Sequence, residues 1–253
     1  MKIFYWSLFL LLLFLFFKLF QLQGFLVLFF NLKPLLFVFL GTLLALSIHF
    51  PISYFVQVPQ LFRSVFSLRH RDPAKLIRMI AGLAILVQKG GPESILNEVK
   101  KIEDPFILMG LRLYLEEVAP EKIEYLLKEN ISKMLVRHQR GALFFDQIAR
   151  YAPGFGVFGS VAGVLMLLSN LNEATYIPSY VFMALLCLFY GTLIANLALP
   201  IAGRLRVLSR EECAEREMVL EGLMAILQQE SPGMVKERME LFLSLHERRK
   251  IQF

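Results

Sequence analysis

The polar side chains that could guide an ion lie in two stretches without charged residues, 154–171 and 179–202. A path for ions through a membrane needs a titratable or strongly polar group at depth. Neither stretch contains an acid, so in an ion-conducting protein the carboxylate has to come from a helix of another chain. We expect the path beside Ser160 and the helix face that bears Cys187, Tyr190 and Gly191. In a protein without ion flow, the same residues would hold helices together.

Small residues recur in both stretches at the spacing of one helix face. Gly156, Gly159 and Gly163 fall near one side of the first stretch, and Gly191 and Ala195 are four residues apart in the second. Small residues let helix backbones approach closely in lipid, where packing replaces the hydrophobic driving force. We expect these residues to pack against neighbouring subunits or a partner helix, and the two preceding apolar runs, residues 3–22 and 34–56, to face lipid.

The composition is that of a membrane protein. The chain has 253 residues, of which 57% are hydrophobic and 19% charged, whereas soluble domains are nearer 45–50% and about 25%. Two cysteines cannot form a disulfide framework. Of 27 Lys and Arg residues, 24 lie in the ranges 63–150 and 204–250, between and after the apolar runs. A nucleic-acid-binding protein would show a basic face without such runs, so we expect no nucleic acid partner.

Four runs are long enough to cross the roughly 30 Å of bilayer hydrocarbon. We predict spans at Ile3–Leu22, Pro34–Val56, Gly154–Leu171 and Ser179–Ala202. The first could also be a signal peptide, but we expect a retained anchor, because no cleavage site of the A-x-A kind follows it.

The distribution of positive charge sets the orientation, because Lys and Arg stay on the cytoplasmic side. The connection between the last two spans has no basic residue, so the basic segments and both termini are cytoplasmic. This topology predicts an all-α protein in four parts. They are a transmembrane hairpin (1–56), a cytoplasmic helical domain (57–152), a second hairpin (153–202) and a cytoplasmic tail (203–253).

Helical signals fill the cytoplasmic parts. A helix over Ala74–Val87 should end at the following Gly and Pro residues, and a second should cover Glu93–Ile102. Asp104 followed by Pro105 predicts a capped helix towards Val118. The longest helix begins near Pro120 and runs to the third span, and another over Arg204–Leu227 extends the fourth.

Two motifs resemble the third and fourth spans of the MotA/PomA flagellar stator family, and the resemblance covers about residues 30–245. The motifs are Arg150-Tyr151-Ala152-Pro153-Gly154-Phe155-Gly156 with Gly159-Ser160-Val161-Ala162-Gly163, and Tyr190-Gly191-Thr192-Leu193-Ile194-Ala195-Asn196 with Pro200-Ile201-Ala202. The small-residue third span is shared with ExbB and TolQ, whereas the second motif and the two hairpins favour the MotA side.

This resemblance implies a pentamer around a dimer of a MotB-like single-span subunit. That subunit supplies an essential Asp and grips peptidoglycan, and ion flow past the Asp turns the pentamer against a FliG-like rotor switch protein. Pro153 and Pro200 stand at the family's two coupling prolines. Alternatively, they simply end helices, since each lacks a backbone donor.

The resemblance also bears on the ion. Ser160 keeps a hydroxyl at the family's third-span Thr, but Cys187-Leu188 replaces a Thr-Thr pair in the fourth span. Sodium needs hard oxygen ligands, which a thiol and an isobutyl group do not supply. We therefore expect protons to be transported, with no cofactor and no bound metal.

The charged motif that the family uses for rotor contact is missing from Met79–Val87. Arg78, Lys89 and Glu93 are the nearest charged substitutes. The sequence therefore predicts a proton-driven stator subunit in the bacterial inner membrane. The alternatives are an ExbB/TolQ-like channel that energises another envelope process and a membrane scaffold without ion flow. Enzyme activity is not expected, because the four His residues are scattered and no nucleophile lies beside a base.

Overall fold

All regular elements in the described part of the chain are helices, as predicted. The computed structural model describes residues 30–66 and 72–244, together with the isolated positions 10, 11, 14, 15, 18 and 248. The elements are α3 (Leu32–His49), α4 (Ile52–Phe66), α5 (Pro73–Gly90), η1 (Pro92–Ile95), α6 (Leu96–Val99), α7 (Pro105–Leu115), α8 (Pro120–Ser169), α9 (Ile177–Leu227) and α10 (Pro232–Glu240). Apart from the isolated positions, the predicted first span Ile3–Leu22 lies outside the described residues.

Two very long helices, α8 and α9, contain the third and fourth predicted spans. They have 50 and 51 residues, so each is roughly 75 Å long at 1.5 Å per residue. Both helices continue beyond the apolar stretch without a break. This confirms the prediction that long helices extend out of the third and fourth spans. Within the described residues, α3, α8 and α9 are the helices long and apolar enough to cross a membrane.

The second predicted span is shorter than expected. We predicted Pro34–Val56, but α3 ends at His49, and α4 begins as a separate helix at Ile52. Phe50 between them is extended, with φ −122° and ψ 140°. The cause is Pro51, whose ring disfavours the helical conformation of the residue before it.

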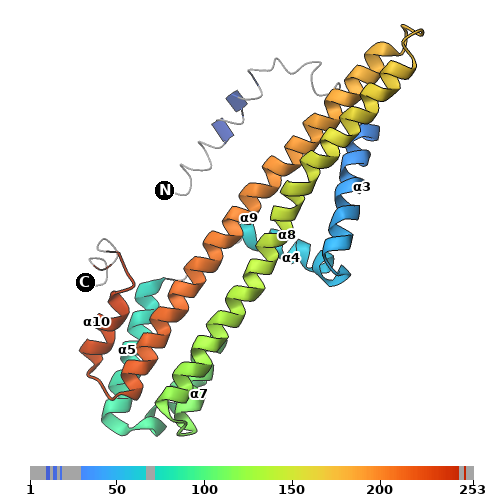
Figure 1. The fold of residues 1–253 in the computed structure, drawn as a ribbon. Helices are drawn as coiled ribbons and strands as arrows, with labels where there is room; N and C mark the ends of the chain where they lie inside the picture. Colours follow the sequence, from blue (N-terminus) through green and yellow to red (C-terminus); the bar gives the residue numbers. More distant parts are fainter. Residues whose placement is uncertain are drawn as a thin grey trace. The chain divides into compact units, whose positions relative to one another are not determined.

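The described residues form two compact units. In the first, which takes residues 1–55 and 145–200, α3 packs along α8 and α9 (Figure 1). The contact centres on Val38 of α3 and on Cys187 and Tyr190 of α9. Many other side chains of these helices are apolar and exposed, as expected for surfaces that face lipid or other subunits.

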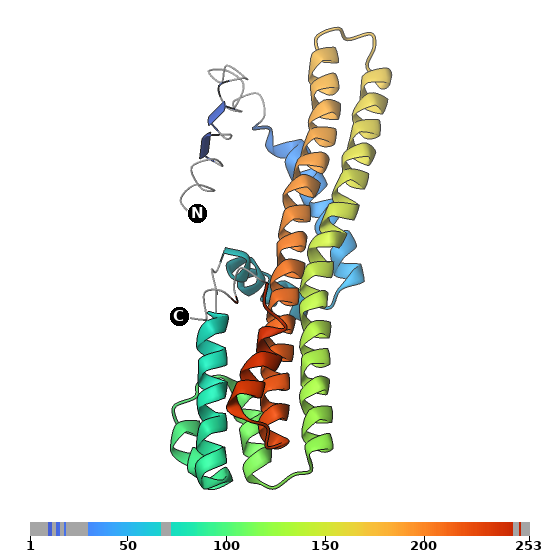
Figure 2. The same ribbon diagram turned by 90° about the vertical axis from the view of Figure 1, so that its left-hand side faces the viewer.

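The second unit takes residues 56–144 and 201–253. Here α5, α7 and α10 lie beside the adjoining parts of α8 and α9 (Figure 2). Glycines allow close packing at two points: a Cβ at Gly110 would lie 2.6 Å from Leu223, and one at Gly222 would lie 2.6 Å from Met239. The fully buried side chains include Ile77, Ile80, Ile95, Ile107, Leu111, Ile123, Leu127, Met218 and Met239.

Local signals set the helix ends of this unit. Asp104 accepts hydrogen bonds from the backbone N–H groups of Phe106 and Ile107 at 2.8 and 3.3 Å, which confirms the predicted N-cap. Gly91 closes α5 in the left-handed region at φ 70°. The predicted Glu93–Ile102 helix is wrong in detail, because η1 and the four-residue α6 replace it. Similarly, α7 ends at Leu115 and not near Val118, because Glu117 turns the chain at φ 55°.

The unit boundaries differ from those of the predicted parts by one to eight residues. The predicted parts end at residues 56, 152 and 202, and the corresponding unit boundaries fall at 55, 144 and 200. The assignment of the parts to membrane and cytoplasm stays a prediction.

Leu127→Ala should destabilise the second unit by about 2–5 kcal/mol, because it removes a side chain that is 0% exposed. The measurement is the unfolding midpoint of the purified protein. Leu96→Ala is the matched control, since Leu96 is 48% exposed on α6. Equal midpoints for the two variants would contradict this core.

Candidate functional site

Two helices of the first unit, α8 and α9, approach one another backbone to backbone. A Cβ added to Gly156 would lie 2.8 Å from the carbonyl oxygen of Cys187. One added to Gly191 would lie 2.7 Å from the carbonyl oxygen of Ala152, and one at Gly163 would lie 3.0–3.1 Å from Ala184. Real Cβ atoms need more room than this, so only small residues permit the contact.

These glycines therefore serve a contact inside one chain. The sequence-based prediction assigned Gly156, Gly159, Gly163 and Ala195 to packing against the ring or a partner. In the structure the three glycines lie against α9, with Phe37 of α3 also next to Gly159, and their packing against the ring or a partner stays a prediction. Ala195 is buried as well.

Three of the four predicted ion-path residues are buried within the first unit. Cys187 is 0% exposed and its sulfur lies against Gly159, while Gly191 lies against Ala152. Tyr190 is 6% exposed, and its hydroxyl accepts a hydrogen bond from the Asn31 N–H at 3.3 Å. A helix of another chain cannot reach these groups while α3 and α8 cover them. Of the four, only Ser160 remains partly exposed.

Two polar residues that the site prediction left out are exposed on α9. The Thr192 hydroxyl donates to the carbonyls of Phe189 and Leu188 at 2.9 and 3.0 Å. The Asn196 side-chain amide donates to the Thr192 carbonyl at 2.9 Å. The sequence carried a signal for them, since positions 192 and 196 each directly follow a small residue of the packed face, Gly191 and Ala195.

Both predicted coupling prolines lie inside continuous helices, Pro153 in α8 and Pro200 in α9. The alternative that they end helices is therefore wrong. A proline has no N–H to donate to the carbonyl four residues earlier. Pro200 thus withdraws the helical hydrogen bond of the Asn196 carbonyl, and Pro153 does the same to Ala149. Asn196 consequently offers both a side-chain amide and a main-chain acceptor that lacks its helical donor.

A hydrogen bond joins the end of α3 to α8 close to Pro153. Nδ1 of His49 lies 3.0 Å from the Tyr151 hydroxyl, two residues before the proline. The ring of Phe50 packs against that of His49 at a tilt of 40°, with ring centroids 4.5 Å apart. The sequence showed His49 as an isolated titratable residue, and its partner is 102 residues away.

The predicted rotor-contact residues do not form one cluster. Arg78 and Lys89 are exposed on α5, where eleven residues of helix separate them by roughly 16 Å. Glu93 is exposed in η1, beyond the end of the same helix.

The described residues contain no group of three His, Cys, Asp or Glu side chains that could hold a metal ion. One thiol has a carboxylate neighbour, since Sγ of Cys213 lies 3.4 Å from Oε1 of Glu217. Burial raises the pKa of the Cys213 thiol, and this hydrogen bond raises it further. The thiol therefore stays protonated at neutral pH and is a poor nucleophile.

Comparison with known proteins identifies the family. A model of the MotA/TolQ/ExbB proton channel family matches residues 98–218. Motility protein A of Borreliella burgdorferi is 31% identical over 189 residues, which are 74% of this chain and 73% of that protein. Motility protein A of Bacillus subtilis is 30% identical over 87% of this chain and 82% of that protein. A solved structure of the flagellar MotAB stator complex from Bacillus subtilis contains a similar chain, with TM-score 0.83, 27% identity and 89% coverage of each chain.

Matches of this extent, together with the three apolar helices, define a class of protein, the membrane-embedded proton channel subunits. Channel subunits of this class are not enzymes. Within the class, the chain belongs to the MotA/PomA flagellar stator family.

Gly156→Ala should destabilise the first unit by about 1–3 kcal/mol, because the added methyl meets a backbone carbonyl that cannot rotate away. Gly154→Ala is the matched control two residues earlier in α8, where an added Cβ meets nothing within 4 Å. The measurement is the fraction of detergent-solubilised complex that survives heating. The α8–α9 contact would be refuted by equal survival of the two variants.

Proposed function

We propose that this chain, with a single-span partner anchored in peptidoglycan, converts proton flow into torque on the flagellar rotor. The observation that carries the proposal is the exposed pair Thr192 and Asn196 on an otherwise apolar face of α9. Residues 151–200 contain one charged residue, Glu173, and it lies in the connection between α8 and α9. The titratable group of the path then has to come from the partner, as a membrane-embedded Asp.

The exposed side chains revise the ion path. In this proposal the partner helix approaches Thr192, Asn196 and Ser160, whereas Cys187, Tyr190 and Gly191 support the path from inside the chain. The main-chain carbonyl of Asn196, released by Pro200, adds an acceptor for water at the same level. A proton needs one carboxylate and a chain of water, which this arrangement would provide.

The first unit lies in the membrane in this proposal, and the second in the cytoplasm. Of the 27 Lys and Arg residues, 23 belong to the ranges of the second unit, in agreement with retention of positive charge on the cytoplasmic side. With the segment Ile3–Leu22 the chain would cross the bacterial inner membrane four times, with both termini cytoplasmic. Five copies would form a ring around two MotB-like partner helices.

The rotor contact belongs to the same proposal. A FliG-like switch protein would meet the second unit at α5 and η1, where Arg78, Lys89 and Glu93 are exposed. The absence of the family's charged motif from Met79–Val87 is the one observation that favours the alternative, an ExbB/TolQ-like channel that energises another envelope process.

We expect swimming driven by this chain and its partner to persist in sodium-free medium and to stop when a protonophore collapses the proton gradient. The reason is that sodium needs several hard oxygens, whereas Cys187 and Leu188 offer none from their side chains. The measurement is swimming speed in a strain whose own stator genes are deleted. Swimming that requires sodium and survives the protonophore would overturn proton coupling.

Asn196→Leu should lower proton leak through the channel on the order of tenfold or more, the effect of losing about 1.4 kcal/mol of hydrogen bonding. Folding should persist, because Asn196 is exposed and Leu is similar in size. Ser169→Ala is the control, since Ser169 is also exposed and also bonds to its own helix, at the Leu165 carbonyl, but is not part of the proposed path. If Asn196→Leu leaked protons as fast as the control, the path would not pass this residue.

A further inference from the structure

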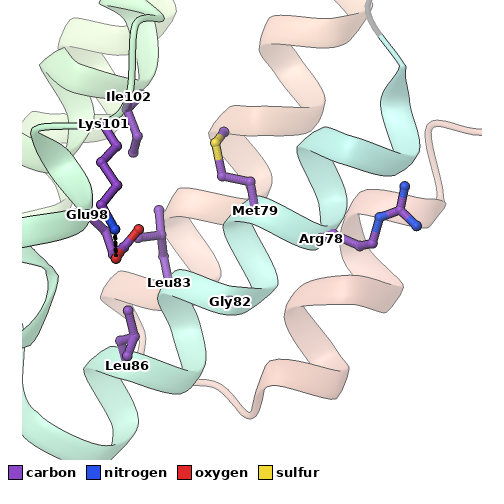
Figure 3. Close-up of a pocket in the computed structure, with 8 residues that line it drawn as sticks. All are labelled: Arg78, Met79, Gly82, Leu83, Leu86, Glu98, Lys101 and Ile102. Carbon is purple, nitrogen blue, oxygen red and sulfur yellow. Dashed lines mark hydrogen bonds and ion pairs between the residues drawn. The ribbon is translucent and has the colours of Figure 1, made fainter.

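A groove of about 460 Å³ runs along α5 in the second unit, facing the short helical segment that follows it. Met79, Leu83 and Leu86 project from α5 towards Ile102, so the walls are mainly apolar (Figure 3). Leu83 is only 4% exposed and forms part of the core beneath the groove.

Gly82 leaves a gap in the groove wall that none of the residues described by the structure fills. An added Cβ there would meet nothing within 4 Å. By contrast, Gly110 and Gly222 in the same unit are needed because their neighbours leave no room for a side chain. A glycine inside a helix costs about 1 kcal/mol relative to alanine. Packing against the described residues does not explain Gly82, whereas close approach of an external group would.

The groove carries a surplus of positive charge. Lys101 Nζ pairs with Glu98 Oε1 at 2.6 Å on one side. On the other side of α5, Arg78 extends away from that pair, and no ion pair to it is found among the described residues (Figure 3). The three charged residues that line the groove therefore have a net charge of +1. A partner with an acidic side chain would complement this charge.

The shape and chemistry fit a helix better than a small ligand. From Met79 to Leu86 the groove follows two turns of α5, roughly 10 Å, which is the spacing of two anchor side chains on a bound amphipathic helix. No lining residue is aromatic, so a nucleotide base would have no ring to stack on.

We propose that this groove receives an amphipathic helix of another protein, with an apolar side chain over Gly82 and an acidic residue paired with Arg78. The inference rests on the proposed function, in which that helix belongs to the rotor. In this inference the rotor contact is anchored by a buried apolar side chain, whereas the sequence-based prediction used exposed charges alone. Lys89 and Glu93 lie outside the groove.

The test is Gly82→Leu in the full complex with its single-span partner. Leucine should fill the groove and lower motor torque at least about tenfold, the effect of losing one strong anchor. Proton leak through the channel should stay at the wild-type level, and thermal stability should be equal or higher because Leu favours the helix. Gly233→Leu is the matched control, an exposed glycine of α10 with only Ser231 Oγ at 4.0 Å from an added Cβ.

The acidic half of the inference has its own test. Arg78→Glu should lower torque, and one Asp or Glu to Arg change in the rotor switch protein should restore it for this variant but not for Gly82→Leu. A systematic set of such reversals without a restoring change would overturn the pairing.

Other outcomes separate the inference from the proposed function. Torque of Gly82→Leu equal to that of Gly233→Leu would overturn the groove as a docking site. A loss of oligomer mass in Gly82→Leu would overturn a foreign helix in favour of a second copy of this chain. Failure of the unsubstituted complex to turn a flagellar motor, with proton leak intact, would instead refute the proposed function.

Discussion

The contact of α8 with α9 at Gly156 and Gly191 is the constraint on which the rest of the first unit depends. Each glycine faces a backbone carbonyl of the other helix, so neither position has room for a side chain. Apolar side chains gain nothing by leaving lipid for a helix surface, and close packing has to supply the attraction instead. This contact orients both helices about their axes, and the orientation decides which residues are exposed.

The exposed faces follow from that orientation. Cys187, Tyr190 and Gly191 lie between α9 and its neighbours, and Thr192 and Asn196 lie outside. The polar groups available to a partner are therefore those of the residues that directly follow Gly191 and Ala195 in the sequence. A face selected by small residues can be mistaken for a face that binds other subunits, because both are made of the same residue types.

Local chemistry was readable from the sequence, and the identity of contact partners was not. Asp104 with Pro105 and the Gly-Pro run after α5 marked helix ends correctly, because capping depends on neighbouring residues. The end of α3 was missed because the apolar run continues past Pro51 into α4, although the proline itself marks the break. Glycine spacing predicted close approach between helices, but small residues carry no information on which helix approaches. The His49–Tyr151 bond joins residues too far apart in sequence for any local pattern to reveal it.

The proline inside α9 has a consequence for chains that have not yet assembled. In hydrocarbon, a carbonyl without a donor is unfavourable by several kcal/mol. While the Asn196 carbonyl faces lipid alone, the isolated subunit carries this cost, and a water molecule or a neighbouring chain removes it. A subunit inserted without its companions is thus distinguishable from an assembled one by the poorly solvated peptide group at Asn196. The free-energy cost of this unsolvated carbonyl is present in the isolated subunit and absent from the complex. It therefore favours assembly of the complex, whether or not ions flow through it.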